Sequence, residues 1–274
     1  MPGTPDPRRR GLTPLTVREA GGEWLIDMSG LRWCDPLHLA GAAALARDRG
    51  TRGGTVRVLG PLDPDARTYA ARMRLGKVLD DLGAAHDFPV VPEHDRTADL
   101  LEVRPVRSED DAVELAELVA RRARAQSPQA STTLFACVVE MALNVADHAG
   151  VVGYVAAQTF PRRRWIRFAV ADTGRGLLAT LADRGADDDK DAVRLALSGT
   201  SRLPGRDRGT GLPTTRRELL SADGWLLLAS GSARLVALTE GDRLSLQRPA
   251  FPGTLVQGAL RIGDRVGGEE YPRP

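Results

Sequence analysis

The segment 131–149, STTLFACVVEMALNVADHA, constrains the chain more than any other stretch. Its apolar residues lie on almost every side of a helix, which predicts a largely buried helix. Glu140, Asn144 and His148 interrupt this pattern at a spacing of four. At about 100° per residue they form one narrow polar stripe. The segment holds no Arg or Lys, which suits a pocket better than a solvated face, although the helix alone leaves both interpretations open.

These side chains have chemistry that suits a binding pocket. A carboxylate such as that of Glu140 can orient a water molecule. An amide oxygen such as that of Asn144 is a hard ligand that suits a magnesium ion. The stripe therefore predicts a polar site along one face of the helix.

A second candidate element is the strand-like run from Ile166, which ends in Asp172 and is followed by Gly174 and Gly176. Glycine permits a close approach of the backbone and unusual torsion angles. A carboxylate fixed at the end of a strand can accept a hydrogen bond from an exocyclic amine such as that of adenine. The run is therefore a candidate nucleotide-binding element.

The same run supports a competing interpretation. Gly174-x-Gly176-x-x-Ala179 between a strand and a helix matches a loose dinucleotide fingerprint, and acidic residues at 188–191 lie at a tolerable distance. An NAD-binding domain would leave the polar stripe unexplained. It would also leave the third element without a role.

The third element is the segment 198–212, SGTSRLPGRDRGTGL, which runs into a helix predicted to start at Pro213. Glycines beside a helix N-terminus present backbone amides to a phosphate, and the three arginines can neutralise its charge. A flexible surface loop is the common alternative. The chain has no Gly-Lys-Ser/Thr loop, since Lys77 is followed by Val78, so a P-loop enzyme is excluded.

In order and separation, the three elements resemble the motifs of the GHKL (histidine kinase/gyrase-type) ATPases over roughly residues 105–264. The N box of that family corresponds to Glu140, Asn144 and His148, with Asp147 beside them. Two glycine boxes follow along the chain. The matching residues are Asp172, Gly174 and Gly176 for the first box, and Gly209, Gly211 and Leu212 for the second.

The resemblance implies an α/β fold, the Bergerat sandwich of a mixed sheet covered by helices on one face, with ATP and magnesium as cofactors. It implies Asn144 on magnesium, Asp172 on the adenine amine, and Glu140 positioning or activating the attacking hydroxyl or water. A flexible lid is expected at 183–208, mobile without nucleotide. The further expected nucleotide-binding residues are His148, Gly174, Gly176, Thr200, Arg208, Gly209, Gly211 and Leu212.

The first folded region, 14–92, predicts a smaller α/β domain because strands alternate with helices. Asp35 before Pro36 is a good helix cap followed by a first-turn proline. The expected elements are strands at 24–28 and 55–59 and helices at 36–49 and 65–82.

The segment Leu25–Leu31 with Cys34-Asp35, followed by an Ala-rich helix, resembles STAS domains, the fold of anti-sigma-factor antagonists. In that family the phosphoacceptor lies just after the equivalent of Asp35. Here Pro36, Leu37 and His38 follow, and none carries a hydroxyl. Regulation by phosphorylation at this point is therefore not expected.

The remaining organisation follows from composition and periodicity. Proline-containing, aperiodic sequence predicts a linker at 93–104, and polar ends predict disordered tails at 1–13 and 265–274. The domain 105–264 is expected to begin with helices and end with a meander. Its expected elements are helices at 109–125, 131–149 and 213–221, and strands at 151–159, 164–171, 225–229, 234–238, 243–247 and 254–262.

Composition excludes several classes of protein. The net charge is only +2, and no basic stripe is interleaved with aromatic residues, so direct nucleic-acid binding is not expected. No apolar run reaches the ~20 residues needed to span a bilayer, so no membrane association is expected. Cys34 and Cys137 lie in apolar segments, which favours two buried thiols in a cytoplasmic protein.

These features favour a signalling regulator similar to the anti-sigma-factor Ser/Thr kinases. Its expected partner is a STAS-type antagonist or a sigma-factor-like regulator, docked through or beside the STAS-like domain. The sequence leaves a homodimer open. The alternatives are an ATP-gated binding module with slow or no hydrolysis and, more remotely, the NAD-binding domain. A histidine kinase is disfavoured, because no dimerisation helix carries a phosphoacceptor histidine.

Overall fold

The computed structural model describes residues 15–92, 100–146, 151–161, 164–198 and 211–263. This part of the chain is α/β, with one mixed sheet, one antiparallel sheet and eight α-helices, which confirms the predicted class. Within it, no helix is both long and apolar enough to cross a bilayer.

The first sheet has the strand order β1-β2-β3-β4. β1 pairs with β2 antiparallel, whereas β2, β3 and β4 are parallel. The parallel pair β2–β3 is joined by helix α1, which the backbone of Asp35 and the ring of His38 help to start. The elements are β1 (Thr16–Ala20), β2 (Glu23–Asp27), α1 (Pro36–Thr51), β3 (Thr55–Leu59), α2 (Pro64–Arg72), α3 (Leu75–Asp81) and β4 (Ala85–His86).

The prediction of a single helix at 65–82 is wrong, because the helix is interrupted between α2 and α3. Arg74 adopts a left-handed conformation with φ of 60°. Met73 is fully buried, and its carbonyl accepts a hydrogen bond of 3.0 Å from the amide of Val103. A tertiary contact from a distant strand thus replaces a helical hydrogen bond, and no local sequence signal marks it.

The second sheet is antiparallel throughout, with the order β5-β6-β7-β9-β8. Mixed pairing therefore occurs in the first sheet and not in this one. β5 begins inside the stretch expected to be a linker. Four strands were expected at the C-terminal end of this domain. The structure has two long strands there, which form a hairpin with register shifts around Gly231. The strands are β5 (Leu100–Val106), β6 (Gly153–Phe160), β7 (Trp165–Asp172), β8 (Trp225–Ala237) and β9 (Arg243–Arg261).

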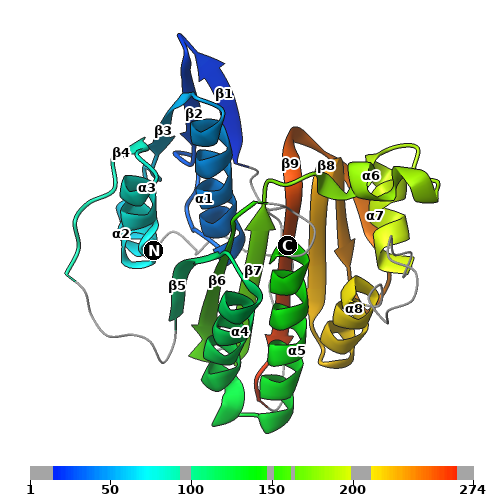
Figure 1. The fold of residues 1–274 in the computed structure, drawn as a ribbon. Helices are drawn as coiled ribbons and strands as arrows, with labels where there is room; N and C mark the ends of the chain where they lie inside the picture. Colours follow the sequence, from blue (N-terminus) through cyan, green and yellow to red (C-terminus); the bar gives the residue numbers. More distant parts are fainter. Residues whose placement is uncertain (1–14, 93–99, 147–150, 162–163, 199–210, 264–274) are drawn as a thin grey trace, which may run out of the picture.

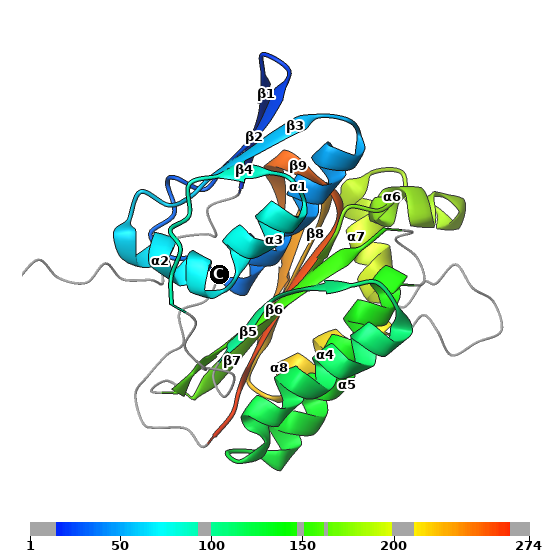
Figure 2. The same ribbon diagram turned by 60° about the vertical axis from the view of Figure 1, so that its left-hand side comes forward.

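Helices cover both faces of the second sheet (Figures 1 and 2). One face packs against α4, α5, α6, α7 and α8, and the other against α1. The first sheet and the second therefore share a hydrophobic core through α1. The helices on the first face are α4 (Glu109–Arg124), α5 (Pro128–Asn144), α6 (Gly176–Leu181), α7 (Asp189–Ser198) and α8 (Gly211–Ser221).

Candidate functional site

Asp172 ends the central strand β7 as a buried carboxylate with 7% exposure. Alternation along β7 places its side chain on the same face as Phe168 and Val170, the face covered by α5. Burial raises the pKa of Asp172 to about 6, although hydrogen bonds from the backbone amides of Gly174 and Thr254 oppose the shift. A buried carboxylate at a strand end is a strong acceptor for a ligand N–H group.

The backbone after Asp172 needs glycines on both neighbouring segments. Gly176 has a φ of +71°. A Cβ at Gly253, on the adjacent strand β9, would lie 2.2 Å from the carbonyl oxygen of Asp172. The hydroxyl of Ser230 donates to the carbonyl of Gly253 (2.8 Å) and accepts from the amide of Leu177 (2.9 Å). These contacts fix the turn that follows β7.

Glu140 and Gly211 bring the first and third predicted elements together. A Cβ at Gly211 would lie 1.9 Å from Oε1 of Glu140 and 2.5 Å from its Cδ. One turn away, the thiol of Cys137 on α5 and the hydroxyl of Thr215 on α8 are hydrogen-bonded. The carboxylate of Glu140 therefore lies directly against the first residue of α8.

Asn144 is the last residue of α5 and is half-buried. The next residue, Val145, packs so closely that a Cβ at Gly153 would lie 2.6 Å from its Cγ1. The same Cβ would lie 2.9 Å from the carbonyl oxygen of Ala171, which precedes Asp172. The end of α5 thus lies beside the end of β7, and Asn144 and Asp172 belong to one region of the molecule.

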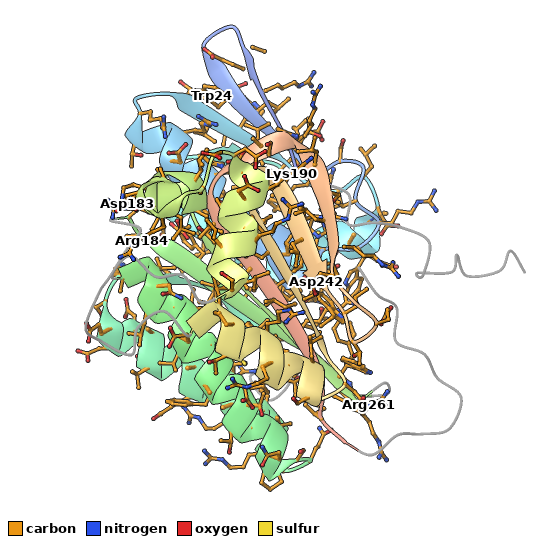
Figure 3. All side chains as sticks on the ribbon, turned by 90° about the vertical axis from the view of Figure 1, so that its right-hand side faces the viewer. Trp24, Asp183, Arg184, Lys190, Asp242 and Arg261 are labelled. Atoms are coloured by element: carbon orange, nitrogen blue, oxygen red, sulfur yellow. The ribbon has the colours of Figure 1, made fainter. Side chains whose placement is uncertain are left out.

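The prediction of a flexible lid at 183–208 is wrong for residues 189–198. Residues 189–198 form helix α7, and Val193 is fully buried against the core. The carboxylate of Asp189 accepts hydrogen bonds of 2.7 Å from both the amide and the hydroxyl of Ser232. Figure 3 shows Lys190 of α7 and Asp183 in the upper half of the view, below Trp24, with Arg261 in the lower half. Asp189 anchors α7 to β8, and residues 199–208 lie outside the described part of the chain.

The competing dinucleotide interpretation loses its structural basis. The fingerprint requires a parallel βαβ unit, but β7 pairs antiparallel with both β6 and β9. The acidic side chain of Asp189, which would face a ribose in that interpretation, bonds to Ser232.

Four of the expected nucleotide-binding residues lie outside the described residues: His148, Thr200, Arg208 and Gly209. Leu212, the second residue of α8, is half-buried and packs against the hydrophobic core. Sequence reasoning missed Ser230, Gly253 and Thr254, which complete the surroundings of Asp172. Gly253 falls between the strands expected at 243–247 and 254–262, whereas in the structure it lies inside β9, where a glycine marks a close approach of the backbone.

Comparison of the chain with protein-family models, with curated proteins and with solved structures gave no match.

We expect Gly211→Ala to displace Glu140, because the new methyl group would overlap its carboxylate. Overpacking costs about 1–3 kcal/mol, and the flexible end of the Glu140 side chain can shift, so the loss in the free energy of unfolding in urea should lie at the low end of that range. Gly50→Ala is the matched control, because a Cβ there meets nothing within 4 Å. Unchanged stability and unchanged nucleotide affinity of Gly211→Ala would argue against the close contact between Glu140 and α8.

Proposed function

We propose that the second sheet and its helices bind ATP with magnesium. The buried carboxylate of Asp172 carries the proposal. A buried carboxylate of this kind has acceptor capacity beyond its bonds to the amides of Gly174 and Thr254, which matches the exocyclic amine of adenine. Gly176 and Gly253 keep bulky side chains away from the strand end beside it. Four of the residues that the GHKL resemblance assigns to the ATP site lie on strand β7 and on two of the helices that cover this face of the sheet. Asp172 ends β7, Glu140 and Asn144 lie on α5, and Gly211 begins α8.

Magnesium fits this site as a partner of the nucleotide. In the described part of the chain no group of three or more His, Cys, Asp or Glu side chains is placed to hold a metal. The amide oxygen of Asn144 is a single hard ligand. Magnesium commonly takes one or two protein oxygens and completes its shell with phosphate oxygens and water. When bound, it would neutralise phosphate charge, and Asn144 would orient it.

We assign the whole chain to nucleotide-dependent signalling of the anti-sigma-factor kinase type. Glu140 would hold the attacking hydroxyl or water by accepting its proton, and contact with Gly211 would fix the position of the carboxylate. The partner that receives phosphate would be a STAS-type protein or a related regulator. A module in which ATP only changes the affinity for a partner is the alternative.

The N-terminal region is better suited to support the second sheet than to accept phosphate as a substrate of the proposed kinase. Asp35, Leu37 and His38, at the start of α1, are buried. Arg167 of β7 pairs with Asp35, and alternation along the strand puts it on the opposite face of the sheet from Asp172. The sheet thus separates this end of α1 from the proposed nucleotide. We infer that a partner docks beside the STAS-like region and not through this end.

Incubation with γ-labelled ATP, with and without candidate STAS proteins, tests the proposed function. A kinase transfers label to the partner, and an ATPase releases labelled phosphate. ATP binding without either product favours the gating module. Failure of magnesium-ATP to bind in a calorimetric titration would contradict both the catalytic function and the gating module.

A further inference from the structure

A cavity of about 400 Å³ lies between α1, β1 and the β8–β9 hairpin. Leu15, Leu37 and Leu45 contribute its wall on the N-terminal side, and Leu227 and Phe251 contribute on the hairpin side. The cavity is on the face of the sheet that packs against α1, and Asp172 points to the opposite face. It is therefore separate from the proposed nucleotide site.

The hairpin bends around this cavity. Leu227 and Arg234 are seven positions apart on β8, yet both line it. The register shifts between them, at Gly231, which has a φ of +57°. The side-chain amide of Gln247 donates to the carbonyl of Gly231 (3.1 Å), which ties β9 to the bend. Leu246 is 61% exposed beside it, so the cavity adjoins solvent on the β9 side.

The charge in the cavity has one sign. Arg234 and Arg248 line it, and no Asp or Glu does. Arg248 is exposed, whereas Arg234 is half-buried among apolar groups. Burial lowers the pKa of the Arg234 guanidinium, which nevertheless stays protonated at neutral pH. Among the residues that the structure describes, no carboxylate lies within ion-pair distance of it.

A partly desolvated guanidinium without a counterion is unfavourable, and an anion placed beside it would offset that cost. The leucines and Phe251 offer an apolar surface next to the charge. Cavities that bind small molecules measure about 300–1,000 Å³ and combine apolar walls with a few polar groups. Both the size and the lining fit a small ligand with one anionic end and one apolar end.

We propose that this cavity binds an amphipathic monoanion, with its alkyl chain against the leucines and its carboxylate on Arg234. The inference does not depend on the proposed ATP site, because the two sites lie on opposite faces of the sheet. The ligand would also contact both α1 and the hairpin, and would therefore stabilise their packing.

Isothermal titration of the full chain with decanoate and with 1-decanol, without nucleotide, tests this proposal. We expect wild type to bind decanoate at least about tenfold more tightly than decanol, since a charge-assisted hydrogen bond is worth that much or more. Arg234→Met keeps an apolar stem but removes the charge, so it should abolish the preference without abolishing decanol binding. Arg234→Lys should retain part of the preference.

Arg243→Met is the matched control, because Arg243 lies on the same hairpin, is exposed, and does not line the cavity. It should bind decanoate as wild type does. An equal loss in Arg243→Met and Arg234→Met would show general charge attraction and overturn the site. Absence of decanoate binding to wild type, or an unchanged preference in Arg234→Met, would overturn it as well. Circular dichroism of Arg234→Met checks that the variant is folded.

Discussion

Glu140→Ala is expected to reduce phosphate transfer or ATP hydrolysis by roughly 10²–10⁴-fold, the usual contribution of a general base. The affinity for magnesium-ATP should change much less, because a base acts mainly in the transition state. Single-turnover rates with labelled ATP and a calorimetric titration separate the two effects. Asn144→Ala should instead weaken magnesium-dependent binding as well as the rate.

Two further variants make this result specific. Glu140→Gln keeps the side chain's shape against Gly211 and removes only the basic carboxylate, so it should lose activity as the alanine variant does. Glu114→Ala, on the exposed surface of α4, should behave as wild type. Full activity of Glu140→Gln would show that the residue has a packing role. Tight ATP binding by a wild type that turns over with no partner would favour the gating module.

Breaking the Asp35–Arg167 ion pair is expected to cause the largest loss of stability. The two side chains are only 10% and 12% exposed, and the guanidinium also lies over the rings of Phe160 and Trp225. Removal of one partner from a buried pair leaves an uncompensated charge and costs about 3–5 kcal/mol. We therefore expect Arg167→Met to lower the free energy of unfolding by that amount, measured with guanidinium chloride at pH 7.

The exposed pair Arg57–Glu23 supplies the control. Its side chains are 48% and 33% exposed, so Arg57→Met should cost less than about 1 kcal/mol. The double variant Asp35→Leu with Arg167→Met should recover much of the lost stability, because no buried charge remains. Similar small losses in Arg167→Met and Arg57→Met would show that the pair does not hold α1 on the sheet.

Local signals predicted much of the fold. The run Thr55–Leu59 forms a strand with the expected bounds, and the cap at Asp35 with Pro36 starts a helix where expected. The helix break at Arg74 had no local signal, because the amide of Val103 competes for the carbonyl of Met73. β5 was expected to be a linker because Pro105 and mixed charge obscured its alternation; it lies at the sheet edge, where proline is tolerated.

The candidate site was predictable only where its residues are close in sequence. The spacing of Glu140 and Asn144 on one helix, and of Asp172 with its glycines, follows from local pattern alone. The contact between Glu140 and Gly211 joins residues 71 positions apart (211 minus 140) and depends on how α8 packs on α5. Ser230 and Gly253 come from the hairpin, whose register no local pattern specifies.

Asp172→Asn separates binding from folding. The carboxyl has a pKa of about 6 in the folded protein and 3.8 ordinarily, so the folded state binds more protons between those values. Stability therefore falls as the pH rises through this window, and the ionised carboxylate costs stability at neutral pH. Asparagine removes that charge and can still accept the bond from the amide of Gly174. The variant should be at least as stable as wild type at pH 7.5.

Titration of magnesium-ATP into wild type and Asp172→Asn at pH 7.5 tests the central claim most directly. Wild type should bind, and the substitution should weaken binding by about 1–3 kcal/mol, the range for a lost charged hydrogen bond. Wild-type affinity should also fall below about pH 6, where protonation removes the negative charge of the acceptor and turns one of its oxygens into a donor. Equal affinity of the two proteins at pH 7.5, or no binding by wild type, would contradict the assignment of Asp172 to the adenine.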